Sequence, residues 1–257
     1  KRTASRDMEI YAAMVDRLDQ NVGRVIQTLK ETGEYDNTVI LFLADNGAEG
    51  VDLSRSELAP FKSIATHADN SFDNRGSATS FVAYGPGWAQ AATAPSWLYK
   101  AYATEGGTRT VSFIAGKDLG RKHPVADAFL SVADVVPTFL DLAGLPKPNG
   151  TFQGRNVEPI RGKSWVPYLT GKADRVYGPN DPYGVELFGS RALRQGDWKI
   201  TDTGNGEWKL FDLATDPGET RDLSPQQPAR FQQLKDAWDR YAREVGVVLP
   251  DQGLYRP

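Results

Sequence analysis

The sequence contains no cysteine and only two histidines, His67 and His123, among its 257 residues. Without cysteine, the chain has no disulfide, no metal site built on thiolates and no cysteine nucleophile. Two imidazoles are too few for a zinc site built on histidine. Any chemistry of this chain therefore depends on oxygen ligands and on cationic side chains.

A basic excess and a long apolar run are also missing. The formal net charge is −3, and no stretch of about 18 uncharged apolar residues occurs. Phosphate-rich partners require a basic excess or a basic patch, so we expect neither a nucleic acid nor a membrane as partner. The hydrophobic share of 40% and the charged share of 25% are ordinary for a globular protein, and the length suits one large domain and a small one.

The N-terminal part predicts a long helix followed by a buried strand. From about Ser5 to Thr32, apolar residues recur at alternating steps of three and four, which places them on one face of a helix that Gly33 is expected to end. The segment Thr38–Ala44 is apolar and uncharged, which is typical of a parallel strand buried on both faces. A helix, a short turn and a buried strand form half of a βαβ unit and predict an α/β fold.

The middle of the chain is less regular. Residues 47–95 are rich in turn-forming residues, and residues 145–180 are rich in proline, glycine and asparagine, as in a long surface connection. We expect three elements here: a short strand within residues 80–90, a second strand within residues 109–116, and a helix within residues 126–144 that begins or kinks near Pro137.

The sequence pattern changes after residue 180. Residues 184–217 alternate apolar and polar side chains between turns that contain glycine, the pattern of an antiparallel meander. Residues 228–247 then predict an amphipathic terminal helix. We therefore expect two domains: an α/β domain over residues 1–180, and a small α+β domain with an antiparallel sheet over residues 181–257.

Asp45 and Asn46 come directly after the predicted strand. The carboxyl end of a parallel strand is where ligand crevices form, and a carboxylate beside an amide offers hard oxygen ligands for calcium or magnesium. Gly47 allows the backbone to turn sharply after them. The same tripeptide also makes ordinary turns, so the residues alone leave both interpretations open.

Lys100 is a second candidate, in the segment YKAYATEGGTRT. Its ammonium group can act as a point charge for an anion, while Gly106 and Gly107 allow a close approach of the backbone. A solvated lysine before a loop fits the same pattern. For Arg109, a salt bridge with an acidic neighbour is the favoured interpretation over a contact with an anion.

Several segments in a fixed order carry a resemblance to a known family. They are MEIYAAMVDRLDQNVGRVIQTL, DNTVILFLADNGAEG, APSWLYKAYATEGGTR, DVVPTFLDLAG, and LRQGDWK followed by LFDLATDPGETRDL. Through them the chain resembles the C-terminal part of the sulfatase family, closely the bacterial arylsulfatases. Several segments in order are far more specific than any single motif.

This resemblance implies part of an alkaline-phosphatase-like α/β sandwich, followed by a small C-terminal domain with an antiparallel sheet and a terminal helix. It implies that Asp45 and Asn46 are ligands of one calcium ion. It also implies that Lys100 binds the sulfate group of a small sulfate ester and takes part in catalysis. In the family the nucleophile is a formylglycine hydrate, made from a cysteine or a serine in a motif of the type Cys-x-Pro-x-Arg.

The sequence departs from the family at this nucleophile. It has no cysteine, and its two Pro-x-Arg triplets carry Val157 and Gln226 two positions before the proline. The family's early acidic pair and its catalytic histidines have no counterpart, and we interpret His67 and His123 as surface residues. We therefore expect an arylsulfatase portion that is inactive alone, whose calcium site a missing N-terminal sulfatase segment completes.

Two alternatives stay open beside this interpretation. One is a phosphonate or phosphodiester hydrolase of the same superfamily, and the other is a non-catalytic remnant that serves binding or assembly. Without their neighbours, the strand Thr38–Ala44 and the apolar helix face before it favour association. We therefore expect the isolated chain to self-associate near residues 38–44.

Overall fold

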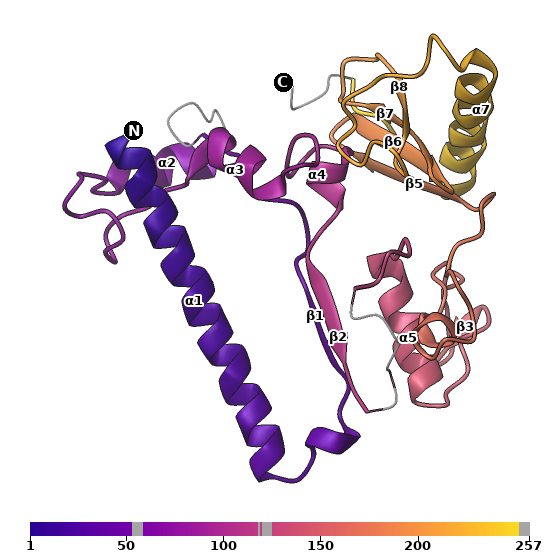
Figure 1. Cartoon of the computed structure of the whole chain (residues 1–257), viewed down its shortest axis with the longest axis horizontal. Helices are drawn as coiled ribbons and strands as arrows, with labels where there is room; N and C mark the ends of the chain where they lie inside the picture. The colour runs from indigo at the N-terminus through magenta and orange to yellow at the C-terminus, as the bar shows by residue number, and fades with distance from the viewer. Residues whose placement is uncertain (53–58, 118, 120–124, 252–257) are drawn as a thin grey trace. The chain divides into compact units, whose positions relative to one another are not determined.

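The computed structural model describes residues 1–52, 59–117, 119 and 125–251. These residues divide into two compact units. The first unit consists of Lys1–Thr32, Phe42–Ser112 and Pro182–Pro257, and the second of Gly33–Leu41 and Phe113–Asp181. Figure 1 labels their helices and strands in chain order. The assignment of residues 1–180 and 181–257 to two separate domains stays a prediction.

The long N-terminal helix is confirmed as α1 (Arg2–Glu31). It ends next to Gly33, which takes the left-handed φ of +75° that glycine adopts without strain. Most of the predicted apolar face of α1 is open to solvent among the described residues: Leu18 is 48% exposed and Val25 is 61% exposed. The periodicity therefore located the helix, but the described residues of the chain leave most of its apolar face uncovered.

The N-terminal end of α1 is the part that packs within the first unit. Asp7 is buried, and its carboxylate accepts two hydrogen bonds from the guanidinium of Arg75 at 2.7 and 3.0 Å. The indole Nε1 of Trp88 donates to the carbonyl of Ala4 at 2.9 Å. These contacts fix the first turns of α1 against residues that lie about 70 to 85 positions later in the chain.

Two short helices follow in the same unit, α2 (Ala59–His67) and α3 (Gly85–Thr93). The strand expected within residues 80–90 is wrong, because α3 begins there. Pro86 lies in the first turn of α3, where its missing N–H breaks no helical hydrogen bond. Within the described residues, no helix is both long enough and apolar enough to cross a bilayer.

The two predicted strands of the α/β part are confirmed as β1 (Ile40–Leu43) and β2 (Ser112–Ala115), which form a two-stranded sheet. The N–H of Ala44 donates to the carbonyl of Val111, and the N–H of Gly47 donates to that of Gly107. The partner's number falls as the chain advances, so the segments run antiparallel. All four residues of β1 are half-buried. The expected parallel strand buried on both faces is therefore wrong here, because apolar content does not encode strand direction.

The second unit is organised around the carboxylate of Asp134, which is fully buried. Its Oδ1 accepts from the hydroxyl of Tyr177 at 2.6 Å and from the N–H of Lys163 at 2.8 Å. Its Oδ2 accepts from the N–H of Ser131 at 2.9 Å and from the indole of Trp165 at 3.0 Å. Four donors compensate the removal of this charge from water.

Several short helices and strands belong to the second unit. They are η1 (Tyr35–Asn37), η2 (Val132–Asp134), α5 (Val135–Leu142), β3 (Thr151–Phe152), β4 (Arg155–Asn156) and α6 (Val166–Leu169). The helix α5 begins just before Pro137, as expected. The long surface connection expected over residues 145–180 is wrong in part, because Trp165, Tyr168 and Leu169 form a buried cluster there.

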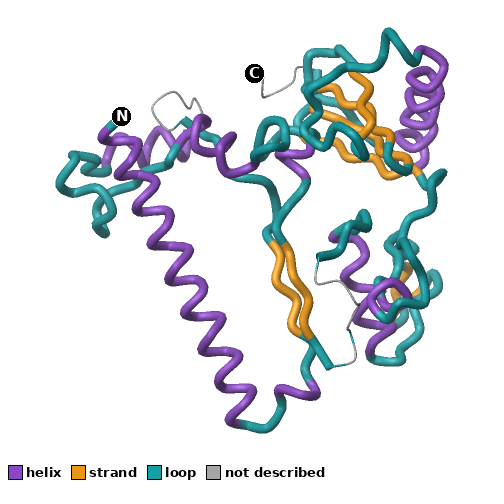
Figure 2. The backbone as a smooth tube through the Cα atoms, in the orientation of Figure 1, coloured by secondary structure: helices purple, strands orange, loops and turns teal. Residues whose placement is uncertain are grey.

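The predicted C-terminal meander and terminal helix are confirmed. The strands are β5 (Pro182–Leu187), β6 (Ser190–Gln195), β7 (Trp198–Asp202) and β8 (Lys209–Asp212), antiparallel and in this order across the sheet. The helix α7 (Pro228–Val245) packs on this sheet. Figure 2 shows the four strands in orange with α7 in purple beside them.

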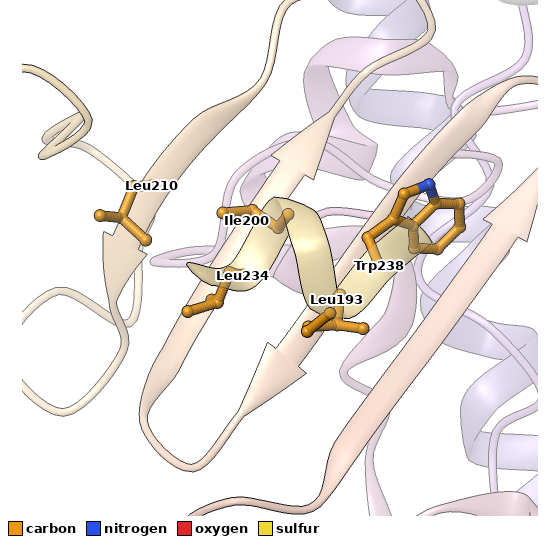
Figure 3. Packing of buried hydrophobic residues seen from close by; sticks show 6 residues of the cluster. Leu193, Ile200, Leu210, Leu234 and Trp238 are labelled. Atoms are coloured by element: carbon orange, nitrogen blue, oxygen red, sulfur yellow. The ribbon is translucent and has the colours of Figure 1, made fainter. Parts of the chain in front are cut away.

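The core of this part lies between α7 and one face of the sheet (Figure 3). It consists of Leu193, Ile200, Leu210, Leu234, Ala237 and Trp238. Side chains alternate between the two faces along a strand, so the neighbours of Ile200 in β7, Lys199 and Thr201, project from the opposite face. Both are nevertheless buried, which means that another segment covers the second face of the sheet.

Candidate functional site

The two predicted metal ligands lie just beyond the end of β1. Asp45 is exposed, and Asn46 is half-buried. The side-chain nitrogen of Asn46 donates to the carbonyl of Gly47 at 3.0 Å, which leaves its oxygen Oδ1 as the atom for a cation. The part of the chain that the structure describes contains no cluster of three or more acidic, histidine or cysteine residues. Asp45 and Asn46 therefore offer two oxygen ligands of the six to eight that calcium takes.

The glycines of this region allow two segments to touch through their backbones. Gly47 donates its N–H to the carbonyl of Gly107 at 2.9 Å. A side chain on Gly47 would overlap the carbonyl of Gly106, and one on Gly106 would overlap the carbonyl of Leu98. The close approach predicted for Gly106 and Gly107 is thus confirmed. Its consequence is that the segment after β1 and residues 97–108 are joined through their backbones.

Lys100 meets the segment that follows Asp45 and Asn46. Its N–H donates to the carbonyl of Ala48 at 3.0 Å, and its ammonium lies 2.9 Å from the carboxylate of Glu49. Both side chains of this ion pair keep more than two fifths of their surface exposed. The loops therefore bring Lys100 into contact with Ala48 and Glu49, which follow the candidate metal ligands closely in the sequence. Lys100 itself lies about 55 positions after Asp45.

The backbone on either side of Lys100 is held in an unfavourable conformation. Leu98 has φ +58° and Ala101 has φ +80°, the left-handed region that residues with a side chain rarely adopt. Between them, Tyr99 packs its ring on Gly50, where a side chain would overlap it. Burial raises the pKa of Tyr99. Strain of this kind persists only where the surroundings over-determine the conformation.

A chain of three buried charges lies behind this loop. The ammonium of Lys199 is 2.8 Å from the carboxylate of Glu105 and 3.0 Å from that of Glu219. The other oxygen of Glu219 accepts the backbone N–H of Glu105 at 2.7 Å. The three residues are only 3%, 8% and 5% exposed, for Lys199, Glu105 and Glu219. The segment that covers the second face of the C-terminal sheet is therefore the loop that carries Lys100.

The three groups shift one another's proton affinities. Burial alone would raise the pKa of Glu105, but Lys199, together with the more distant Arg194 and Arg109, holds it below its ordinary value of 4.5. For Glu219, burial and the charge of Glu105 raise the pKa despite Lys199. The two carboxylates outweigh burial at Lys199 and raise its pKa, so this lysine is charged.

The other sequence candidates lie outside this constellation. Arg109 is exposed and acts on Glu105 through its charge, in line with an acidic neighbour as its partner. His67 is exposed at the end of α2, with its Nδ1 2.7 Å from the carbonyl of Ser63, which agrees with a structural role. His123 lies outside the described residues. The sequence did not single out Glu49, Lys199 and Glu219.

Comparisons with known proteins agree with the motifs. A sequence profile described as Sulfatase matches residues 1–145, more than half of the chain. An uncharacterized sulfatase of Schizosaccharomyces pombe is 44% identical over 269 residues, which cover 100% of this chain and 48% of the relative. An arylsulfatase of Klebsiella aerogenes is 36% identical over 165 residues, which cover 64% of this chain and 35% of that protein. The chain spans half or less of the length of these curated relatives.

The fold is also shared with a solved sulfatase. The crystal structure of the PsFucS1 sulfatase from Pseudoalteromonas sp. superposes with a TM-score of 0.57 at 19% identity, over 90% of this chain and 42% of that one. This likeness confirms the predicted alkaline-phosphatase-like α/β fold with a C-terminal antiparallel sheet and helix. On the profile match and the relatives together, the chain belongs to the sulfatase family.

Proposed function

We propose that the complete protein hydrolyses sulfate esters, and that this chain contributes Asp45, Asn46 and Lys100 to the active site. The observation that carries the proposal is the contact between the two loops, in which the N–H of Lys100 donates to the carbonyl of Ala48. This contact joins the loop of Lys100 to the residues that directly follow Asp45 and Asn46, and it supports a site that combines a cation with two hard oxygen ligands. Family membership supplies the reaction class.

The two oxygen ligands fit part of a calcium site. Asp45 offers an exposed carboxylate and Asn46 an amide oxygen, both of the hard type that calcium prefers. When bound, the ion would act as a Lewis acid on an oxygen of the sulfate. The remaining ligands would come from water or from the segment that completes the site.

Lys100 would bind the sulfate and stabilise the charge that develops on it. As the bond between sulfur and the ester oxygen breaks, negative charge moves toward the leaving oxygen, and an ammonium fixed beforehand stabilises this charge without reorganisation. Glu49 keeps the ammonium in place at 2.9 Å. The lysine remains partly exposed, so a substrate anion can reach it from solvent.

This chain does not provide the nucleophile that the family resemblance implies. It has no cysteine to become formylglycine, and neither Pro-x-Arg triplet has a serine in the required position. We propose that a separate sulfatase segment supplies the nucleophile and the remaining calcium ligands. The chain alone is then inactive toward sulfate esters.

The test compares the chain alone with the chain joined to such a segment. We expect turnover of 4-nitrophenyl sulfate only in the complete protein, and loss of this turnover on treatment with EDTA and recovery with calcium. A phosphonate monoester and a phosphodiester serve as competing substrates. Faster turnover of either one would favour the phosphonate or phosphodiester alternative, while no turnover of any ester would favour the non-catalytic alternative. Turnover by the 257-residue chain alone would contradict its proposed inactivity.

A further inference from the structure

The loop that carries Lys100 is attached to the C-terminal sheet at three points. The N–H of Ala103 donates to the hydroxyl of Ser190 at 2.9 Å. The N–H of Glu105 donates to the carboxylate of Glu219 at 2.7 Å, and the side chain of Glu105 is 2.8 Å from the ammonium of Lys199. All of these groups are buried. The C-terminal sheet thus contacts the loop at Ala103 and Glu105, three and five residues after Lys100.

We propose that Lys199 is a positioning residue: clamped between Glu105 and Glu219, it fixes the loop that presents Lys100 to the substrate's sulfate group. The proposal rests on the sulfate-binding role proposed above for Lys100. It assigns the C-terminal sheet a part in catalysis, because its second face sets the position of a catalytic cation.

The choice of side chains supports positioning over mere burial. A lysine in the middle of a strand is expensive to bury, and an apolar residue would fill the same space without that penalty. Lys199 also lies on the face opposite Ile200, so it is not part of the core beneath α7. The clamp therefore gives the sheet a directional contact with the loop. The hydrophobic core beneath α7 does not depend on this contact.

The backbone conformation of the loop gives an independent argument. Leu98 and Ala101 flank Lys100 in the left-handed region, at φ +58° and +80°. Such conformations relax unless contacts hold them. On one side of the loop, Ala48 accepts the N–H of Lys100, and on the other the Lys199 clamp holds Glu105. Gln90 and Thr93 also hydrogen-bond to the backbone of Leu98, and Ser190 accepts the N–H of Ala103. Loss of the clamp removes the charged support among these contacts.

The first experiment measures hydrogen exchange in the full 257-residue chain, below its melting temperature, in four variants. We expect Lys199→Met and Glu219→Met to speed exchange in residues 97–108 by about tenfold or more. Glu219→Gln keeps an acceptor for the N–H of Glu105 and should stay near wild type. Ile200→Val, next to Lys199 but facing the core, is the control for general destabilisation and should leave the loop unchanged.

The second experiment measures steady-state kinetics of the same variants in the complete sulfatase with 4-nitrophenyl sulfate. Because a displacement of about 1 Å costs up to about 10²-fold in rate, we expect kcat to fall by about ten- to a hundredfold in Lys199→Met. Ile200→Val should retain wild-type kcat and KM. A higher kcat in Glu219→Gln than in Glu219→Met would support positioning, because only the glutamine keeps an acceptor for the N–H of Glu105. Equal losses of kcat would indicate a simple loss of packing.

Each result decides one question. If exchange in the loop is unchanged, or rises equally across the whole first unit, the clamp does not position the loop and the proposal is wrong. If Lys199→Met does not fold, the comparison of Glu219→Met with Glu219→Gln decides whether the clamp positions the loop. If wild-type complete protein hydrolyses no sulfate ester, the proposed function fails, whereas the exchange data still show whether the clamp holds the loop.

Discussion

The ammonium of Lys100 lies 2.9 Å from the carboxylate of Glu49, four residues beyond Asp45. Both side chains keep about two fifths of their surface exposed, and exposed ion pairs contribute between zero and about 1 kcal/mol to stability. The pair therefore matters for geometry rather than for folding. It holds the ammonium of Lys100 against the segment that follows the two candidate calcium ligands, with about two fifths of the lysine side chain open to solvent.

Replacing Lys100 by alanine should weaken turnover far more than stability. In the complete protein we expect kcat/KM for an aryl sulfate to fall by about 10²- to 10³-fold, the range observed when a preorganised charge-stabilising group is lost. The thermal midpoint should change little, since the side chain is partly exposed and its ion pair with Glu49 is weak. Lys117→Ala, at an exposed lysine, is the control. Near-normal turnover in Lys100→Ala would return Lys100 to the status of a solvated lysine.

Calcium should bind weakly to the chain alone. Asp45 and Asn46 supply about two of the six to eight ligands of this ion, and water must supply the others. We expect calorimetric titration to give a dissociation constant above the micromolar range, and Asp45→Ala to abolish the residual binding. A sub-micromolar affinity that is lost in Asp45→Ala would mean that this chain holds further ligands.

The carboxylate of Asp134 should be the most sensitive single position of the second unit. Asp134→Asn replaces one acceptor oxygen by a donor, so at least one of its four buried or half-buried donors loses its partner, at about 1–3 kcal/mol for each group left unpaired. We expect a loss of about 2–5 kcal/mol in the free energy of unfolding of this unit, measured by denaturant titration. Tyr177→Phe removes a single donor at 2.6 Å and should cost about 1 kcal/mol. Equal effects of the two variants would contradict this assignment.

The sequence predicted features of this region where the signal was local. Gly106 and Gly107 mark a close backbone approach that the structure confirms, whereas the role of Asp45 and Asn46 as metal ligands stays a prediction. The direction of β1 was not local, because an apolar run fits parallel and antiparallel partners equally well. Its burial was overestimated for the same reason: the pattern records what a strand can bury, not what covers it.

The buried charges were missed for a different physical reason. Lys199 alternates with Ile200 in β7, and a lysine in such a pattern normally indicates the solvent face of a sheet. Its partner Glu105 lies 94 positions earlier, and Glu219 meets the backbone of Glu105 across 114 positions. Only the tertiary fold, which lays the Lys100 loop on that face, turns these residues into a clamp.

The acid side of the stability profile should depend on Glu105. Its pKa lies below the ordinary value of 4.5, because Lys199 outweighs burial, so the unfolded chain binds this proton more tightly than the folded one. The stabilisation is therefore complete above about pH 4.5 and is lost as the pH falls through the folded pKa. The raised pKa of Glu219 acts in the opposite sense, and its contribution declines as the pH rises.

We therefore expect the difference in unfolding free energy between wild type and Glu105→Gln to be constant near neutral pH and to shrink as the pH falls below about 4.5. Denaturant titrations at a series of pH values measure it. Glu158→Gln, at an exposed position of the second unit, is the control and should show no such trend. A difference that grows on acidification would show that Glu105 is not stabilised as a carboxylate.

The exposed apolar face of α1 should control the oligomeric state of the chain in solution. Met14, Val15, Leu18 and Val25 are 65%, 45%, 48% and 61% exposed. They lie at helical spacing on one side of α1, and apolar patches of this kind favour association. The half-buried strand β1 lies within residues 38–44, where we expect copies to pair, and its backbone adds a second route to association.

We expect the chain alone to sediment as a dimer or larger species whose population grows with concentration. A charge on the apolar face, Leu18→Glu, should shift the equilibrium toward the monomer, because association would bury an unpaired carboxylate. Gln20→Glu adds the same charge to an exposed polar position of α1 and should leave association unchanged. If the monomer persists at high concentration and the amides of residues 38–44 are fully protected from exchange, the strand and helix find their cover within one chain and the prediction is wrong. If Leu18→Glu and Gln20→Glu weaken association equally, net charge rather than the apolar face controls it.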